Sequence, residues 1–161
     1  MDAKEGGLLV RTQTGQELVE AELRVRVRLD FKGVSRPGKL FFGGKPTEKV
    51  AEETREQQLA LFRNVPVQGI RIEDISLGGE IYTVFDEQGN VEVAYAPAEL
   101  TLVADTVEDL VRFVVRDDFR RIEVLEPANV VLRRLDVERL MFRVNEENKA
   151  VQRMLERKYA R

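Results

Sequence analysis

The sequence contains neither cysteine nor histidine. The absence of cysteine excludes disulfides and thiolate nucleophiles, and the absence of both excludes zinc sites built from these residues. Without histidine there is also no serine–histidine triad and no imidazole base near neutral pH. Carboxylate chemistry remains open, including a Mg²⁺ site built from acids such as Asp74, Asp86 and Asp105, although no spacing among them selects a metal. We therefore expect a non-enzymatic protein that needs no cofactor or metal.

Long apolar runs and a large excess of one charge are also missing. No run of about 18 apolar residues is present, so we expect no membrane-spanning segment. Residues 1–7 lack the charged and apolar regions of a signal peptide, which favours a cytoplasmic location. The net charge of −3 is too close to neutral to predict bulk nucleic-acid binding. The high charged content, 34%, is typical of a thermophile-like composition.

Alternation of apolar and polar residues predicts most of a sheet. Residues 23–31 place their apolar side chains on one face of a strand, whereas a helix would scatter them around its circumference. Residues 70–75 alternate in the same way. Residues 81–85 and 91–95 are expected to form a hairpin around the turn at 86–90.

Three helices are expected beside these strands. The first begins at Pro46, a residue favoured in the first helical turn, and reaches Phe62. The second begins after Asp105, which is expected to be its N-cap, with Glu108 completing a capping box. The third is a long C-terminal helix that Asp136 can cap. Strands and helices together predict an α+β fold, mostly antiparallel sheet with about three helices.

The stretch from Ala98 to Leu132 is the central part of the predicted fold. It is expected to form a strand at 99–103, the second helix, a strand at 121–125, a turn and a third strand at 130–132. This order is typical of half of a ferredoxin-like layer, an analogy that carries no function.

The chain is expected to divide near Arg63, or to form a single domain. Residues 1–63 would then be an N-terminal region of strands, a loop and a helix. Residues 64–161 would be a β-rich α+β core that ends in the C-terminal helix.

The C-terminal helix carries an apolar stripe that needs a partner. The stripe is interrupted by polar residues at 145–148, so either one long helix leaves the body of the domain or the helix breaks and restarts there. Core packing on the same chain and helix pairing across a dimer both suit its last part. The stripe consists of Val137, Leu140, Met141, Val144, Val151, Met154 and Leu155. We predict a non-catalytic interaction or regulatory module that forms a homo-oligomer, with Val151, Met154 and Leu155 at the interface, or that binds another protein.

A second hypothesis is a protein that binds nucleotides or nucleic acid. On the strand at 23–31, Arg24, Arg26 and Arg28 form a ladder about 7 Å apart, which is either a solvated face or a surface for anions or partners. The loop at 32–45 is glycine-rich and positive. Within it, Phe41 and Phe42 can stack on bases or dock on a partner, with Lys39 as a positive charge nearby, or Leu40–Phe42 can fill the core as a short strand.

A version of the second hypothesis rests on the segment Asp74-Ile75-Ser76-Leu77-Gly78-Gly79. It resembles the Asp-x-Ser-x-x-Gly half of the PilZ domain, a β-barrel that binds cyclic diguanylate, and the segment from Phe62 to Pro66 is similar to the entry into such barrels. The resemblance implies that Asp74, Ser76 and Gly79 contact the guanine and Arg63 a phosphate. The chain departs from the family where a second arginine is expected, at Leu59. The same residues also suit a tight turn between strands.

Overall fold

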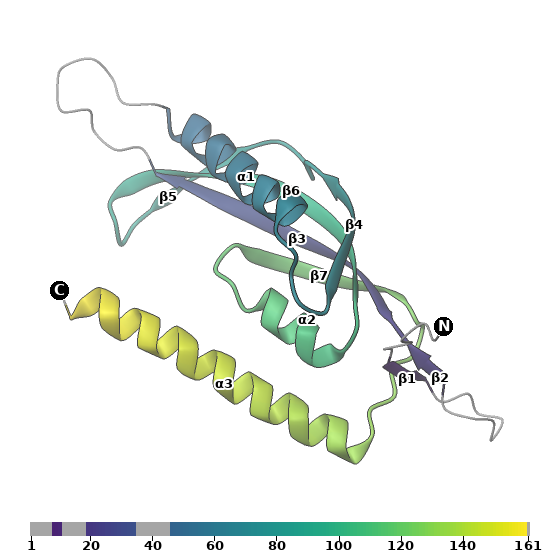
Figure 1. The fold of residues 1–161 in the computed structure, drawn as a ribbon. Coiled ribbons are helices and arrows are strands. Elements are labelled where there is room, and N and C mark those ends of the chain that lie inside the picture. The colour runs from purple at the N-terminus through teal and green to yellow at the C-terminus, as the bar shows by residue number, and fades with distance from the viewer. Residues whose placement is uncertain (1–7, 11–18, 35–45, 161) are drawn as a thin grey trace, which may run out of the picture.

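The computed structural model describes residues 8–10, 19–34 and 46–160. It contains an α+β fold, as the sequence predicts: a five-stranded antiparallel sheet and three helices, the last one long (Figure 1). A separate pair of short strands lies at the N-terminal end. The elements are β1 (Leu8–Val10), β2 (Val19–Ala21), β3 (Leu23–Val34), α1 (Thr47–Asn64), β4 (Ile70–Ser76), β5 (Tyr82–Asp86), β6 (Val91–Ala104), α2 (Val107–Val114), β7 (Phe119–Glu126) and α3 (Arg134–Tyr159).

Two long strands form the centre of the sheet. β3 pairs with β6 along its whole length, from Leu23 opposite Ala104 to Val34 opposite Val93. β4 and β5 share the other edge of β6, one at each end, and β7 lies on the far side of β3. The predicted strands at 91–95 and 99–103 are therefore one strand. The strand predicted at 23–31 continues through Gly33, which the sequence assigned to the loop.

The stretch from Ala98 to Leu132 forms a split β-α-β unit. β6 and β7 are both antiparallel to β3 and lie on either side of it, with α2 in the connection between them. The third strand predicted at 130–132 is wrong, because these residues form no strand and lead into α3. A run of three apolar residues has no period of its own, so it fits a packed connection as well as a strand.

The core lies between one face of the sheet and the two helices α1 and α2. The apolar face of β3 and Leu100 and Leu102 of β6 are fully buried there, together with Leu59 of α1 and Phe113 of α2. At its N-terminal end, α1 packs through small residues: Ala51 lies against the alanines of β6. Small side chains let a helix approach a sheet closely, so α1 packs on the sheet at this end without large apolar side chains.

A buried arginine occupies the interruption between β4 and β5. The outer edge of β6 has no strand partner at Pro97, which lacks an N–H and can tolerate such a gap. Arg55 of α1 is buried beside it, and its Nη1 donates to the carbonyl oxygen of Pro97 at 3.1 Å. The guanidinium thus replaces a strand donor at this point.

The start of α2 differs from the prediction by one residue. The N-cap is Thr106, not Asp105, and its hydroxyl oxygen accepts the backbone N–H of Asp109 at 3.1 Å. Either residue is a good cap by type, and only the backbone geometry decides between them. Glu108 therefore does not complete the capping box that the sequence suggested.

This cap gives a testable stability difference. Thr106→Ala removes the hydroxyl that satisfies the Asp109 N–H, so we expect it to lower the free energy of unfolding by about 1 kcal/mol. Asp105→Ala is the matched control and should change stability by less than about 0.5 kcal/mol. Urea unfolding of both variants provides the measurement; equal losses would show that the cap contributes nothing of its own.

The C-terminal helix is continuous. α3 runs without a break from Arg134 to Tyr159 and includes the polar residues at 145–148. Its N-cap is Arg133, not Asp136 as predicted: Asp136 stands at the third helical position, where its carboxylate accepts the backbone N–H of Arg133 at 2.9 Å. Hydrogen bonds from the guanidinium and the backbone of Arg133 lower the pKa of Asp136. α3 packs mainly on α2, along the outside of the molecule (Figure 1).

Candidate functional site

The arginine ladder, Arg24, Arg26 and Arg28, lies on the sheet face opposite α1 and α2, and each arginine has a carboxylate partner. Arg24 pairs with Glu73 of β4 at 2.8 Å, and Arg26 pairs with Glu123 of β7 at 3.0 Å. Arg28 pairs with Asp30 of its own strand at 2.9 Å. Glu73 and Glu123 are acids on neighbouring strands, brought close by the sheet. The ladder therefore presents paired charges, and each exposed pair contributes little to stability.

Sequence reasoning missed a buried carboxylate at the end of this ladder. Asp30 is only 2% exposed and accepts a hydrogen bond from the Tyr82 hydroxyl at 2.5 Å, in addition to its pairing with Arg28. Nε of Arg120 lies 3.6 Å from the same carboxylate. Burial and the hydrogen bond to Asp30 raise the pKa of Tyr82. One carboxylate therefore joins β3, β5 and β7. The one available signal was that Asp30 takes the next position of the ladder with the opposite charge.

A cavity of about 340 Å³ opens beside this buried carboxylate. Two of its three acids are engaged: Asp30 as above, and Asp118 in an ion pair and hydrogen bonds with Arg116. The third, Asp117, is exposed. The aromatic wall is Tyr95, whose ring stacks on Tyr82 with centroids 5.4 Å apart and lies under the Arg120 guanidinium. The arrangement thus holds strands together, and neither Asp30 nor Asp118 is free to act as a base.

Of the residues that the PilZ resemblance names, the structure brings two together. Arg63 and Asp74 line a hollow of about 560 Å³ between the end of α1 and β4, whereas Ser76 and Gly79 do not line it. Gly79 has a φ of +134°, a conformation that L side chains rarely adopt, so the turn accounts for it. The described sheet is open, with β4 and β7 at its two ends, and differs from the barrel that the resemblance implies.

The other predicted ligand residues are less informative. Lys39, Phe41 and Phe42 lie outside the described residues. Asp86 accepts the backbone N–H groups of Gln88 and Gly89 in the hairpin turn. Within residues 8–10, 19–34 and 46–160, no group of three or more acidic side chains is placed to hold a metal ion, and no helix is long and apolar enough to cross a bilayer.

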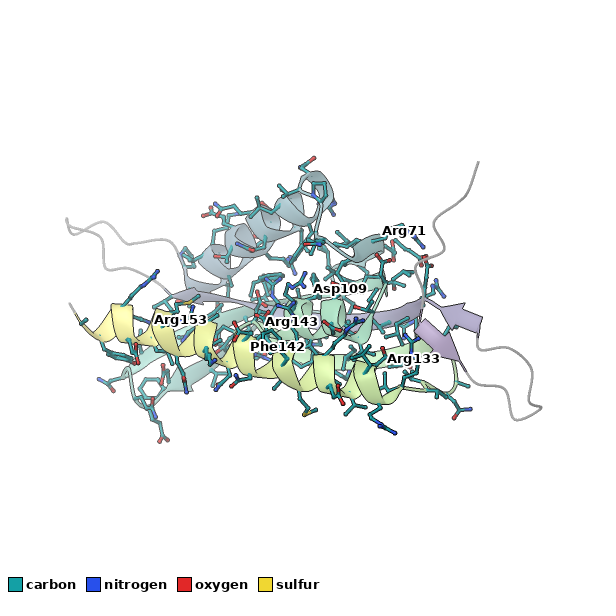
Figure 2. The ribbon with its side chains drawn as sticks, turned by 60° about the horizontal axis from the view of Figure 1, so that its bottom comes forward. Arg71, Asp109, Arg133, Phe142, Arg143 and Arg153 are labelled. Carbon is teal, nitrogen blue, oxygen red and sulfur yellow. The ribbon has the colours of Figure 1, made fainter. Side chains whose placement is uncertain are left out.

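The predicted interface residues lie on the outside of α3. No residue of this helix is buried, and every residue from Asn148 to Ala160 is exposed. Val151, Met154 and Leu155 belong to this uncovered part. Figure 2 shows the helix across the front of the molecule, with Arg133 near its start, Phe142 and Arg143 in the middle and Arg153 near its end.

Packing on α2 divides the apolar stripe of α3. The partly covered residues Asp136, Leu140, Arg143 and Glu147 recur at helical spacing and form one side. Met154, seven residues after Glu147, lies on the same side of the helix but is exposed. The other five apolar residues of the stripe form a second row next to it, which we call the open row: Val137, Met141, Val144, Val151 and Leu155. These five side chains are 39–58% exposed. Phe142 is 64% exposed and lies on a different side of the helix, two residues' rotation from Leu140.

Comparison of the whole chain with protein-family models, with curated proteins and with solved structures gives no match in any of the three.

Proposed function

We propose that this protein is a non-catalytic interaction module that associates with a second copy of itself through the open row of α3. The observation that supports the proposal is the row itself: five aliphatic or thioether side chains on one helix, all substantially exposed within the described chain. Single exposed apolar residues are normal on a protein surface, whereas several exposed apolar residues aligned on one side of an element are typical of an interaction site.

The physical argument concerns the second half of the helix. From Asn148 onward α3 makes no contact that covers a residue, yet it continues for three turns to Tyr159. A helical segment of this length is marginal in water on its own, because most helical stability in proteins comes from packing an apolar face. Covering one fully exposed valine or leucine contributes about 1.5–3 kcal/mol. A partner on the open row supplies the packing that α2 does not reach.

The test is the mass of the protein in solution, measured by light scattering during size exclusion. We expect the wild type to have at least twice the chain mass of 18.5 kDa. The double variant Val144→Lys/Val151→Lys should have the mass of one chain, because it places charges in the middle of the row. Lysine forms helices at least as well as valine, so the helix itself is retained.

Phe142→Lys is the matched control. It introduces one lysine, as each half of the double variant does, at an exposed apolar residue of the same helix but outside the open row. We expect this variant to keep the mass of the wild type. A wild type with the mass of one chain, or a double variant that associates as the wild type does, would contradict the proposal.

A further inference from the structure

We infer that the two copies of α3 pack side by side in the same direction, as a parallel two-stranded coiled coil in which Asn148 of one chain faces Asn148 of the other. The inference rests on the proposed self-association and adds the number of chains, their direction and their register. It follows from the spacing of the open row, from the residue in its middle and from the position of α2.

The spacing is that of a heptad repeat. Along the open row the residues follow at intervals of four, three, seven and four, from Val137 to Leu155. Asn148 divides the interval of seven into four and three, and it is exposed on the same side. Alternating steps of four and three are the pattern of the two core positions of a coiled coil. The seam, defined as the open row plus Asn148, spans about 27 Å of helix.

Asn148 distinguishes this pattern from an ordinary apolar stripe. It is the only polar residue of the seam between Val137 and Leu155. In two-stranded parallel coiled coils, a single asparagine at such a position fixes register and the number of chains, since its amide finds a partner only in the asparagine of the other chain. A seam made for an unrelated apolar groove would gain nothing from this residue, whereas a second copy in register satisfies it.

The body of the protein leaves the seam accessible. The row that packs on α2 contains Leu140 and Arg143, and each lies one residue before a seam residue, Met141 and Val144. One residue corresponds to a rotation of about 100°. A second helix on the seam therefore approaches from the flank of α3. In a symmetric parallel pair the two bodies then lie on opposite flanks.

The residues beside the seam suit the parallel direction. In a parallel pair, the residue just before Met141, Asn148 or Leu155 faces a residue of the other chain that lies five positions later in the sequence. The facing pairs along α3 are Leu140 with Asn145, Glu147 with Gln152, and Met154 with Tyr159. None of them brings two like charges together. Met154 and Tyr159, which are 70% and 80% exposed in the single chain, both gain a neighbour.

Single-cysteine variants test the direction and register, because the wild-type chain has no cysteine and each variant carries one thiol. We would replace Val137 and, in a second protein, Val151 by cysteine, and follow disulfide formation between chains under mild oxidation. In a parallel pair in register both positions face their own copies, so both variants should cross-link. In an antiparallel pair at most one of two positions 14 residues apart can face its own copy.

Arg153→Cys is the control, because this residue lies on the outer side of the helix, away from the seam. We expect both seam variants to cross-link at least about tenfold faster than the control, since pairing raises the effective concentration of the thiols to millimolar. Light scattering of the wild type, which should give twice 18.5 kDa, tests the proposed self-association separately from the direction and register of the helices. The wild type could associate although one or both of the seam variants fail to cross-link, or its mass could correspond to more than two chains. In either case this inference is wrong and the proposed function stands. A wild type of one chain's mass overturns both.

Discussion

Replacing Gly33 by alanine should lower the free energy of unfolding by about 3 kcal/mol, the upper part of the range for overpacked sites. A Cβ at this position would lie 2.2 Å from the backbone nitrogen of Ala51 and 2.7 Å from the carbonyl oxygen of Thr47. Both atoms belong to the backbone of α1, so no side chain can rotate away. The helix has to move off the sheet, and the packing of Ala51 on β6 is lost with it.

The measurement is thermal unfolding, where a loss of this size lowers the melting temperature by about 6–12 °C for a chain of this length. Gly89→Ala is the matched control. The nearest atoms to its added Cβ are the ends of the Val91 and Asp86 side chains, at 3.2 and 3.3 Å, which can shift. We expect a change below about 0.5 kcal/mol there. Similar losses in the two variants would mean that the close approach of α1 does not depend on Gly33.

The role of Gly33 cannot be predicted from the local sequence. Its neighbours include further glycines and a proline, and a glycine in such company predicts a loop. The structure instead uses it as a strand residue whose missing side chain admits a helix backbone. Nothing near position 33 in the sequence indicates that residue 51 will lie against it, so the close approach could be found only from the fold.

The same limit applies to the buried carboxylate. The alternation at 23–31 correctly predicted the strand and the faces of its residues, because alternation is a local property. The cluster on Asp30 combines residues from β3, β5 and β7, separated by 52 positions for Tyr82 and more for Arg120. Pairing across strands is not encoded in any local pattern, so the sequence could not select Asp30 among 29 acids.

For α3 the sequence predicted the apolar residues but not their grouping. Leu140 and Met141 were assigned to one stripe, and the polar residues at 145–148 counted as an interruption. The position of α2 separates the two residues, since Leu140 is partly covered and Met141 is exposed. Once Leu140 and Met154, which each precede a residue of the open row, are set apart from the stripe, the remaining intervals are regular and Asn148 falls within them. Asn148, which interrupts the apolar stripe in the sequence, lies on the same side of α3 as the open row and belongs to the seam.

Replacing Asp30 by asparagine should lower the free energy of unfolding by about 2–3 kcal/mol, the range for hydrogen bonds that involve a charged group. Asparagine has nearly the same shape, so packing is kept and the charge is removed. An amide oxygen in the place of Oδ2 accepts the Tyr82 hydroxyl and faces Arg120, but the amide nitrogen in the place of Oδ1 then turns its donors toward Nε of Arg28. Water can reach these arginines, whose side chains are about one third exposed, so the loss stays below that of a fully buried ion pair.

Tyr82→Phe isolates one bond of this cluster and should cost about 1 kcal/mol. The loss in the double variant should be smaller than the sum of the two single losses by at least about 0.5 kcal/mol, because Asp30→Asn weakens the hydrogen bond at 2.5 Å that Tyr82→Phe removes. Urea unfolding measures all three at one fixed protein concentration, since the midpoint of an associating chain depends on concentration. Strictly additive losses would show that the charge of Asp30 acts through the arginines alone and does not strengthen the hydrogen bond to Tyr82.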